Sequence, residues 1–458
     1  MIQDFKPCHV VNEEIGRGKT YTLITYGCQM NENDSEVIAA IVENFGFIFT
    51  ENMADADLVI INTCAVRKKP EDKVTSLLGK LSILKKERHS LKIAVGGCMS
   101  QQQDFAQQLK KRFPGVDLIF GTHALTKLPD LIKQIFTDKR TVIDIEEHNR
   151  VHEGLPSRPK NTFHAWVPVI YGCDNFCAYC VVPYVRGRER SRELESIIKE
   201  VHELVSSGYK EVTLLGQNVN SYGNDLYGPE SFAKLLTCLD QIDGLARIRF
   251  MTSNPKDLSN EVIAVIRDSR KICEHIHLPV QSGSNRILEL MNRQYTREYY
   301  LNLVNKIRSE VPGISITTDI LVGFPGENEN DFLDTLELLQ EIKFDNAFAF
   351  IYSKRMNTKA ASLEDHISYK EKEERLSRIN AVQQPISKMI NERLKGNTCE
   401  ILVEGRSKNN EQMLTGRTRS NKLVHFASSC HLEGQLLNVK IEKALTWNLV
   451  GSLQDGEK

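Results

Sequence analysis

Three cysteines stand within nine residues of this chain, in the stretch GCDNFCAYC at positions 172–180. Their spacing, C-x3-C-x2-C, offers three thiolate ligands and no fourth one nearby. A structural zinc site needs four ligands, usually from two C-x2-C pairs, whereas three cysteines can hold a 4Fe-4S cluster whose fourth iron stays open. We therefore interpret Cys173, Cys177 and Cys180 as cluster ligands. A zinc knuckle completed by a distant His or Cys is the alternative.

An iron left open in such a cluster can chelate the amino and carboxylate groups of S-adenosylmethionine. An electron from the cluster then cleaves the sulfonium to methionine and a 5′-deoxyadenosyl radical, while the protein supplies position and exclusion of water. The cysteine loop follows an apolar run at residues 167–170 that predicts a strand. Six such runs alternate with helical stretches over residues 160–392, which predicts a partial (βα)6 barrel with its chemistry at the C-terminal strand ends.

Three more cysteines each follow an apolar run nearer the N-terminus. They are Cys28, Cys64 and Cys98, after the predicted strands at residues 21–26, 58–62 and 93–95. Amphipathic stretches between these strands predict a doubly wound parallel α/β domain over residues 20–140. Because ligands lie beyond the carboxyl ends of such strands, we expect the three cysteines to converge and to be able to hold a second 4Fe-4S cluster. The other five, Cys8, Cys238, Cys273, Cys399 and Cys430, are interpreted as packing or incidental residues.

The remaining parts of the chain differ in composition and in the pattern of apolar residues. Residues 148–162 contain two prolines and little apolar sequence, which is typical of a linker. The barrel region ends in a charged helix that we expect to be interrupted near Pro385. Residues 395–455 carry short alternating strands, which predict a small all-β barrel of the oligonucleotide-binding kind.

Four polar side chains follow the predicted barrel strands, where the amino acid, ribose and adenine of the cofactor are expected. They are Gln217, Ser253, Gln281 and Asp319. Ordinary strand-end capping is the alternative for all four. The segment GFPGE at residues 323–327 lacks the G-x-G-x-x-G frame, and it predicts a tight turn leading into a helix rather than a phosphate cradle.

Composition limits the setting of this chemistry. The formal net charge is −1, with 41% hydrophobic and 26% charged residues, which is typical of a globular protein and gives no global signal for nucleic acid. Eleven cysteines, mostly far apart, do not match the disulfide framework of a small secreted domain. Neither a signal peptide nor an apolar run of membrane-spanning length is found, so we expect a cytoplasmic protein with no membrane partner.

Basic residues nevertheless gather in two places. The first group, Arg186, Arg188, Arg190 and Arg192, follows the cysteine loop, and the second, Arg406, Lys408, Arg417, Arg419 and Lys422, lies in the C-terminal module. Local charge of this kind can bind a phosphate backbone, and Phe426 could stack on a base or belong to the core. The alternatives are ion pairs with Glu189 and Glu193 for the first group and a solvated face for the second.

The motifs around the cysteines resemble those of one family. YGCQMNENDSE, INTCAVR and GGCMSQ surround the three N-terminal cysteines, GCDNFCAYCVVPYVRGRERSR contains the loop, and LPVQSGS and TDILVGFPGE lie in the barrel. The loop is similar to that of the radical S-adenosylmethionine superfamily. From about residue 21 to residue 453 the chain resembles the methylthiotransferases, and within them YGCQMN and CVVPYVRGRERSR are most similar to the branch that modifies isopentenyl-adenosine in tRNA.

This resemblance implies an N-terminal domain with a sulfur-supplying cluster, a radical core and a C-terminal TRAM domain that binds RNA. It also implies two 4Fe-4S clusters and S-adenosylmethionine used twice, as radical source and as methyl donor. The implied substrate is a tRNA anticodon stem-loop carrying isopentenyl-adenosine, methylthiolated at carbon 2, and the implied electron donor is flavodoxin- or ferredoxin-like; we expect a monomer. The alternatives are threonylcarbamoyl-adenosine in tRNA or a ribosomal-protein aspartate as substrate, and a non-catalytic iron–sulfur protein that binds RNA or carries electrons.

Overall fold

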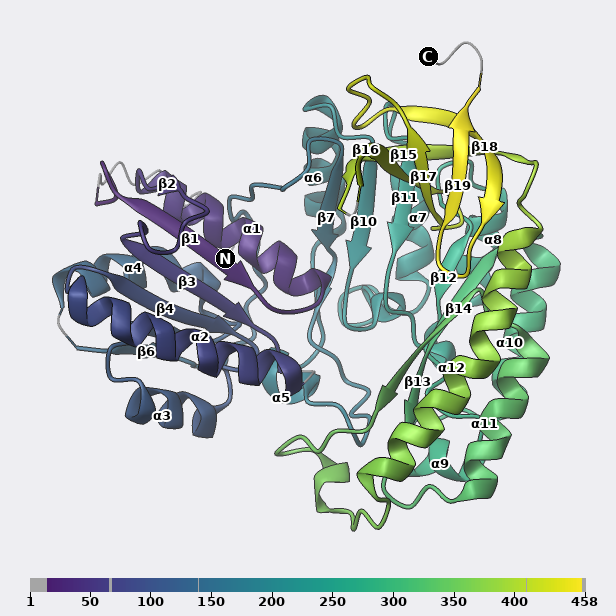
Figure 1. Ribbon diagram of the computed structural model, residues 1–458, viewed down its shortest axis with the longest axis horizontal. Coiled ribbons are helices and arrows are strands. Elements are labelled where there is room, and N and C mark those ends of the chain that lie inside the picture. The colour runs from purple at the N-terminus through teal and green to yellow at the C-terminus, as the bar shows by residue number, and fades with distance from the viewer. Residues whose placement is uncertain (1–14, 66–67, 139, 409, 455–458) are drawn as a thin grey trace. The chain divides into compact units, whose positions relative to one another are not determined.

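The computed structural model describes residues 15–65, 68–138, 140–408 and 410–454, without the side chains of residues 68–71. The chain forms two compact units (Figure 1). The first comprises residues up to 160 together with 171–174 and 180–192, and the second comprises residues 161–170, 175–179 and 193 onward. The cysteine loop therefore contributes residues to both units.

The first unit is a six-stranded parallel sheet in the order β2-β1-β3-β4-β5-β6. Its strands are β1 (Thr20–Thr25), β2 (Ile48–Phe49), β3 (Leu58–Thr63), β4 (Lys92–Gly97), β5 (Leu118–Phe120) and β6 (Val142–Asp144). Its helices are α1 (Gln29–Asn44), α2 (Lys68–Glu87), α3 (Gln103–Arg112), η1 (Ala124–Lys127), α4 (Leu128–Thr137) and α5 (Val182–Arg186). Residues of α1 and α4 share one apolar cluster and residues of α2 and α3 share another, so the prediction of a doubly wound domain is confirmed.

Strand β3 shows why this sequence forms a central strand. Leu58 and Ile60 belong to the cluster under α1 and α4, whereas Val59 and Ile61 belong to the cluster under α2 and α3. Successive side chains of a strand point to opposite faces, so an unbroken apolar run is buried only when both faces are covered. The run therefore specifies a strand with helices on both sides.

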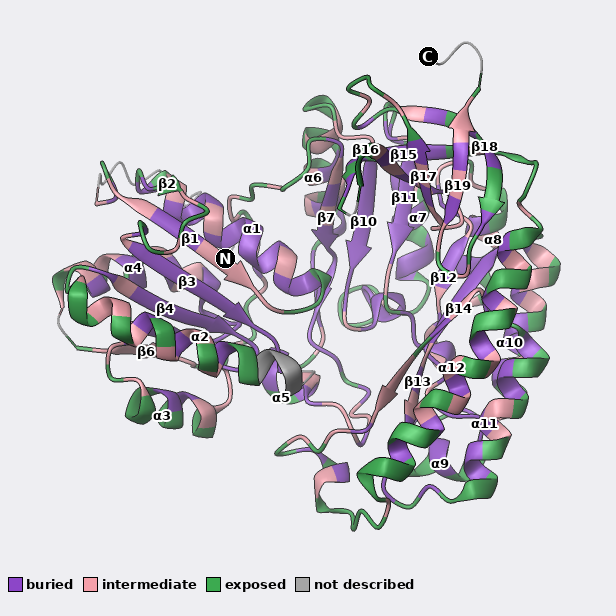
Figure 2. Cartoon of the chain, in the orientation of Figure 1, coloured by how far each residue is buried: buried purple, intermediate pink, exposed green. Residues whose placement is uncertain are grey.

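The second unit begins with six parallel strands in two groups, β7-β10-β11 and β12-β13-β14. They are β7 (His164–Pro168), β10 (Glu211–Leu215), β11 (Arg247–Phe250), β12 (His275–His277), β13 (Ser315–Val322) and β14 (Asn346–Ile351), and an isolated parallel bridge joins Ile248 to Ile272 between the groups. The longer helices are α6 (Leu194–Ser206), α7 (Ser231–Asp240), α8 (Asn260–Asp268), α10 (Arg297–Glu310), α11 (Glu329–Ile342) and α12 (Tyr369–Glu392). Short elements of this unit are α9 (Asn285–Leu290), η2 (Val219–Ser221), η3 (Pro255–Asp257) and η4 (Lys359–Ser362), whereas β9 (Arg190–Ser191) belongs to the first unit and β8 (Ile170–Tyr171) is divided between the two. The six predicted strands are confirmed, and Figure 2 shows them as mostly buried apart from β14, whose residues are mostly intermediate.

Helix α12 continues through Pro385, so the predicted interruption is wrong. Proline removes one backbone hydrogen bond, but tertiary bonds hold the helix on both sides of it. Gln383 donates to the carbonyl of Phe344 at 2.8 Å, and Ser387 donates to the carbonyl of Asp345 at 2.8 Å. Contacts that are remote in sequence thus override the local signal of the proline.

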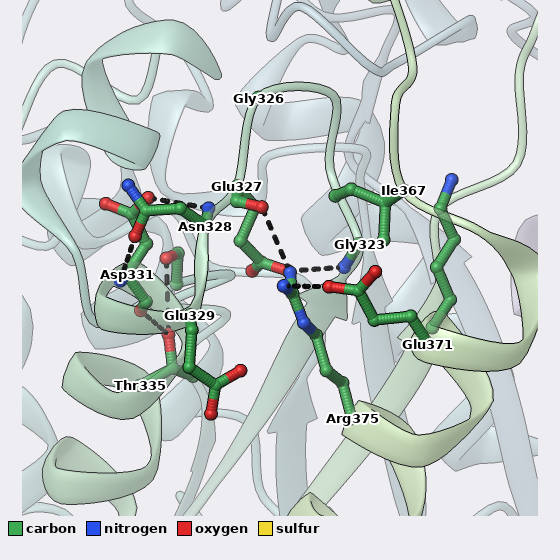
Figure 3. A network of polar contacts seen from close by, with 12 residues as sticks. Gly323, Gly326, Glu327, Asn328, Glu329, Asp331, Thr335, Ile367, Glu371 and Arg375 are labelled. Atoms are coloured by element: carbon green, nitrogen blue, oxygen red, sulfur yellow. Dashed lines mark hydrogen bonds and ion pairs between the residues drawn. The ribbon is translucent and has the colours of Figure 1, made fainter.

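The turn at residues 323–327 leads directly into α11, as predicted (Figure 3). One carboxylate oxygen of Glu327 accepts the backbone N–H of Gly323 at 2.7 Å and the guanidinium of Arg375 at 2.7 Å. Asn328 and Asp331 then form a capping box at the start of the helix. The Glu327 carboxylate closes the turn on itself, which supports the interpretation as a structural turn.

The C-terminal strands form a closed barrel in the order β15-β16-β17-β19-β18 within the second unit. They are β15 (Thr398–Ser407), β16 (Asn410–Thr418), β17 (Leu423–Ala427), β18 (Leu436–Ala444) and β19 (Leu449–Leu453). The small barrel is confirmed, although the sequence pattern missed β19 as a separate strand. Phe426 is 0% exposed in the core of this barrel, so the core alternative for this residue is confirmed. Among the residues described, no helix is long and apolar enough to cross a membrane.

Candidate functional site

The three N-terminal cysteines follow three neighbouring strands of the first unit. Strands β1, β3 and β4 are adjacent; Cys28 is the N-cap residue of α1 just beyond β1, and Cys64 and Cys98 come directly after β3 and β4. The prediction that cysteines remote in sequence reach the same edge of the sheet is confirmed. Connections leave β1 and β3 in opposite directions, which makes this edge the topological switch point where such sheets bind ligands.

A glycine and an asparagine allow the segments that carry the three cysteines to lie close together at the strand ends. A Cβ on Gly97, whose φ is 95°, would collide with the carbonyl of Thr63 and the side chain of Asn62. Asn31 accepts a hydrogen bond from the thiol of Cys28 at 3.4 Å and donates to the carbonyl of Thr63 at 3.1 Å. Gly97, which precedes Cys98, and Asn31, which accepts from Cys28, therefore both lie against the end of β3. That strand ends directly before Cys64.

Charge around this triplet is supplied by a buried arginine. Arg186 lies at the end of α5 and is 5% exposed. Burial raises the pKa of the Cys98 thiol above its usual value, and the Arg186 guanidinium opposes that rise through its charge and a hydrogen bond. Metal and cluster ligation requires the thiolate, which a neighbouring cation stabilises. The donor set therefore fits a cluster bound through thiolates.

In the described residues, no group of three or more His, Cys, Asp and Glu side chains could hold one metal ion. The described cysteines have no disulfide bonds; Cys238 and Cys399 pack beside apolar cores as expected, and Cys8 lies outside the described residues.

The cysteine loop is held in a defined backbone conformation. Gly172 has a φ of 77°, and a Cβ there would collide with the carbonyl of Arg188. In the second unit, the backbone N–H of Ala178 donates to the carbonyl of Met291 at 2.9 Å, and the Asn292 side chain donates to the carbonyl of Phe176 at 3.1 Å. The segment that carries Cys177 is thus fixed to the residues just after α9.

Two polar side chains at the barrel strand ends are buried without partners. Ser253, predicted as a cofactor contact, is 3% exposed and its hydroxyl makes no hydrogen bond to the described residues. Asn220, which the sequence interpretation missed, is 7% exposed. Neither atom of its side-chain amide makes a hydrogen bond to the described residues. They follow the adjacent strands β11 and β10. Because unpaired buried polar groups are costly, this pair fits a polar ligand bound at the strand ends.

The other predicted cofactor contacts are placed differently. Gln217 is half-buried two residues after β10, and Gln281 has a φ of 71° beyond the end of β12. Asp319 lies inside β13 rather than at its end, because that strand continues to Val322. The backbone N–H of Gln281 donates to the carbonyl of Asp319 at 2.9 Å, so these two positions are neighbours.

The arginines after the loop form ion pairs, as the structural alternative expects. Carboxylate partners are Asp34 for Arg186 at 2.6 Å, Asp174 for Arg188 at 2.8 Å and Glu153 for Arg192 at 3.1 Å. The pairing expected with Glu189 and Glu193 stays a prediction. Burial of Arg186 also argues against the phosphate contact predicted for it.

The basic residues of the C-terminal barrel divide into two groups. Arg419 binds Glu274 at 2.7 Å and Lys422 binds Asp345 at 2.5 Å, which fastens the small barrel to the (βα)6 barrel of the same unit. Arg417 pairs with Glu404 at 2.9 Å. Arg406 and Lys408 are exposed, with Arg406 donating to the carbonyl of Glu411 at 2.6 Å. The exposed pair is the part of this group best placed for phosphate.

Comparison with known families gives three matches along the chain. Residues 20–121 match the Uncharacterized protein family UPF0004, residues 167–339 match the Radical SAM superfamily, and residues 392–453 match the TRAM domain. The Radical SAM match implies S-adenosylmethionine and a 4Fe-4S cluster as cofactors.

Curated relatives match nearly the whole chain. The tRNA-2-methylthio-N(6)-dimethylallyladenosine synthase of Carboxydothermus hydrogenoformans is 51% identical over 95% of this chain and 99% of its own. The protein of the same name from Natranaerobius thermophilus is 50% identical over 96% of this chain and 98% of its own. Among solved structures, the radical S-adenosylmethionine methyltransferase TsrM from Kitasatospora setae shares the fold, with a TM-score of 0.54 and 15% identity over 75% of this chain and 77% of that one.

Proposed function

Because the chain belongs to the family of tRNA-2-methylthio-N(6)-dimethylallyladenosine synthases, we propose that it inserts a methylthio group at carbon 2 of isopentenyl-adenosine beside the anticodon of tRNA. The observation that carries this proposal is about 50% identity over nearly the full length of both chains. The positions of the two cysteine triplets support it, since each follows strand ends where these folds bind ligands.

In this proposal Cys173, Cys177 and Cys180 hold the radical cluster. When bound, a 4Fe-4S cluster with S-adenosylmethionine supplies the 5′-deoxyadenosyl radical that removes hydrogen from an unactivated aromatic carbon. The chain contributes the fixed loop backbone, and Asn220 and Ser253 offer hydrogen bonds to polar groups of the cofactor. Gln217, Gln281 and Asp319 complete the proposed cofactor contacts.

We assign the second triplet, Cys28, Cys64 and Cys98, to a second 4Fe-4S cluster that serves sulfur transfer. Asn31 orients the Cys28 thiol, and Arg186 stabilises negative charge at Cys98. Exposure of Cys28 beside two buried cysteines leaves one side of this site accessible to a second S-adenosylmethionine and to the substrate carbon. In this proposal Cys28, Cys64 and Cys98 thus serve sulfur transfer, and the loop cysteines serve radical formation.

The remaining partners follow from the same proposal. Arg406 and Lys408 on the C-terminal barrel contact tRNA phosphates, and Arg188 does so with the RNA near the cysteine loop. A small low-potential electron carrier of the flavodoxin or ferredoxin type reduces the radical cluster. The chain acts as a monomer.

One experiment tests the substrate and the reaction together. The protein is reconstituted anaerobically with iron and sulfide and incubated with dithionite, S-adenosylmethionine and an anticodon stem-loop that carries isopentenyl-adenosine. Mass spectrometry of the nucleosides should show the methylthio product, and a matched stem-loop carrying threonylcarbamoyl-adenosine should stay unmodified. Modification of the second stem-loop alone would assign the other tRNA substrate, and modification of neither, with no 5′-deoxyadenosine, would refute the proposal.

A further inference from the structure

Arg293 is a buried arginine beside the cysteine loop in the second unit. It is 6% exposed and follows α9 by three residues. Its guanidinium donates to the Sγ of Cys177 at 3.3 Å, the hydroxyls of Tyr295 at 2.9 Å and Tyr179 at 3.5 Å, the carbonyl of Pro279 at 3.0 Å and the Oδ1 of Asn254 at 3.5 Å. Every one of these acceptors is formally neutral except a deprotonated cysteine.

This guanidinium has no carboxylate partner in the described part of the chain, in contrast to three other buried arginines. Arg186 pairs with Asp34, Arg249 pairs with Glu211 at 3.0 Å and Arg375 pairs with Glu327 at 2.7 Å. A buried charge is costly unless an opposite charge compensates it. Arg293 therefore requires an anion, and Cys177 is the acceptor that can provide one.

The arginine is also held rigidly in place. The Tyr295 hydroxyl, which accepts from Nε of Arg293, donates to the carbonyl of Val280 at 2.9 Å, and the guanidinium carbon lies 5.1 Å from the centroid of the Tyr295 ring. A planar guanidinium fixed on several sides keeps one N–H directed at the sulfur. Its orientation is therefore set before any ligand binds.

We infer that Arg293 compensates the Cys177 thiolate when that thiolate holds a cluster, and that its charge and hydrogen bond raise the reduction potential of this cluster. This inference rests on the proposed function, in which the loop binds a 4Fe-4S cluster. Hydrogen bonds to ligand sulfurs and nearby charge are among the factors that set cluster potentials. Arg293 is thus a positioning residue. It makes reduction of the loop cluster by the electron donor, the step before cofactor cleavage, more favourable.

The test is a redox titration of the full-length reconstituted protein, followed by electron paramagnetic resonance. Arg293→Met keeps most of the side-chain volume and removes the charge, whereas Arg293→Lys keeps the charge. The control is Arg286→Met, which removes a half-exposed cation that pairs with Asp331 in the same segment. Titration of the Cys28, Cys64 and Cys98 triple alanine variant assigns the loop cluster's signal.

We expect Arg293→Met to lower the ratio of reduced to oxidised loop cluster at a fixed potential at least tenfold, which is about 59 mV for one electron. Arg293→Lys and Arg286→Met should stay within about threefold of the parent. An unchanged midpoint in Arg293→Met with a full iron content would overturn the inference, and so would an equal shift in Arg293→Lys. If Arg293→Met loses the loop cluster, the midpoint potential of Arg293→Lys is used instead. A midpoint that keeps this ratio within about threefold of the parent supports the inference, and a larger shift overturns it.

Two further readouts separate this inference from neighbouring explanations. A weaker affinity for S-adenosylmethionine at an unchanged potential would mean that Arg293 contacts the cofactor carboxylate instead, which overturns the inference. If replacing Cys173, Cys177 and Cys180 by Ala leaves the iron content of the parent unchanged, the proposed function itself fails. If the loop cluster binds normally and its potential is the same in the parent and in Arg293→Met, only this inference is refuted. The proposed function is then unaffected.

Discussion

Arg186 donates a hydrogen bond to Asp34 over 2.6 Å, and the side chains of both are only 6% exposed within the first unit. The carboxylate holds the guanidinium in place beside Cys98 and neutralises its charge before any cluster binds. The pair links α5, which follows the cysteine loop in sequence, to α1, which begins just after Cys28.

Asp34→Asn should destabilise the cluster-free protein strongly, because it leaves the Arg186 charge buried and uncompensated. Breaking one partner of a buried pair costs about 3–5 kcal/mol, and the loss is measured as the free energy of unfolding in urea. The matched control is Asp174→Asn, which breaks the exposed pair with Arg188 and should cost less than about 1 kcal/mol. Equal losses in both variants would contradict this role for Asp34.

The two cysteine triplets should separate into two half-reactions. Replacing Cys28, Cys64 and Cys98 by Ala should leave cleavage of S-adenosylmethionine to 5′-deoxyadenosine intact and abolish the methylthio product. Replacing Cys173, Cys177 and Cys180 by Ala should abolish both. Each triple variant should lose about half of the iron bound by the parent, since each triplet suffices for one cubane.

Circular dichroism must first show that each triple variant is folded, because loss of a cluster can unfold the domain that it holds together. If the folded variant without Cys28, Cys64 and Cys98 still methylthiolates at the parental rate, these three cysteines are only packing residues. Full radical cleavage by the loop variant would remove the assignment of the radical site.

Asn220→Ala and Ser253→Ala should each weaken binding of S-adenosylmethionine about tenfold, because each removes one hydrogen bond to the ligand. The stability of the ligand-free protein should not fall, since neither side chain has a hydrogen-bond partner to lose among the residues that the structure describes. Ser221→Ala is the control, because the Ser221 hydroxyl donates to the carbonyl of Asn218 at 2.8 Å. Isothermal titration calorimetry should show parental affinity for the control, and parental affinity in the first two variants would exclude them as cofactor contacts.

Glu36 should make the first unit less stable as the pH rises. Burial raises the pKa of Glu36 from 4.5 to about 7, and its Oε2 accepts no hydrogen bond from the described part of the chain. Between about pH 4.5 and pH 7 the folded state holds a proton that the unfolded state has lost, so stability falls across this window and is constant above it. Glu36→Gln should therefore be more stable than the parent at pH 8 by on the order of 2 to 3 kcal/mol.

That gain should vanish below pH 4.5, where Glu36 is protonated in both states of the parent. Comparing parent and variant at each pH cancels other titrating groups, including His123 and His152, whose pKa values burial lowers to about 4 and about 3. A stability difference that is independent of pH in urea melts would show that the carboxyl does not titrate in this range.

Charge reversal should separate the two groups of basic residues on the C-terminal barrel. Arg406→Glu with Lys408→Glu should weaken tRNA binding and reduce its dependence on salt, because phosphate contacts release counterions. Arg419→Glu with Lys422→Glu should instead lower the melting temperature, since these side chains pair with Glu274 and Asp345. Filter binding at several salt concentrations and calorimetry measure the two effects. Unchanged tRNA affinity in the first variant would assign Arg406 and Lys408 to a solvated face.

Much of the architecture is readable from local patterns. The apolar run of β3 and the cysteine after it suffice to predict a buried strand and its ligand edge, because both signals lie within one short segment. Pro385 shows the limit of this reasoning, since the bonds that keep α12 continuous reach Phe344 and Asp345, about 40 positions away. Arg293 is missed for the same reason: its role depends on a contact with Cys177, and nothing in its own sequence neighbourhood indicates a sulfur.

The first unit is discontinuous in sequence, and this affects the order of events during translation. Val181 and Val185 pack with Met99 and Cys98, and residues 180–192 join the unit only after the first strand of the second unit has been synthesised. A nascent chain that ends at residue 160 lacks the apolar and charged groups that close this site. The ribosome must therefore synthesise the cysteine loop at residues 173–180 before the packing around Cys98 is complete.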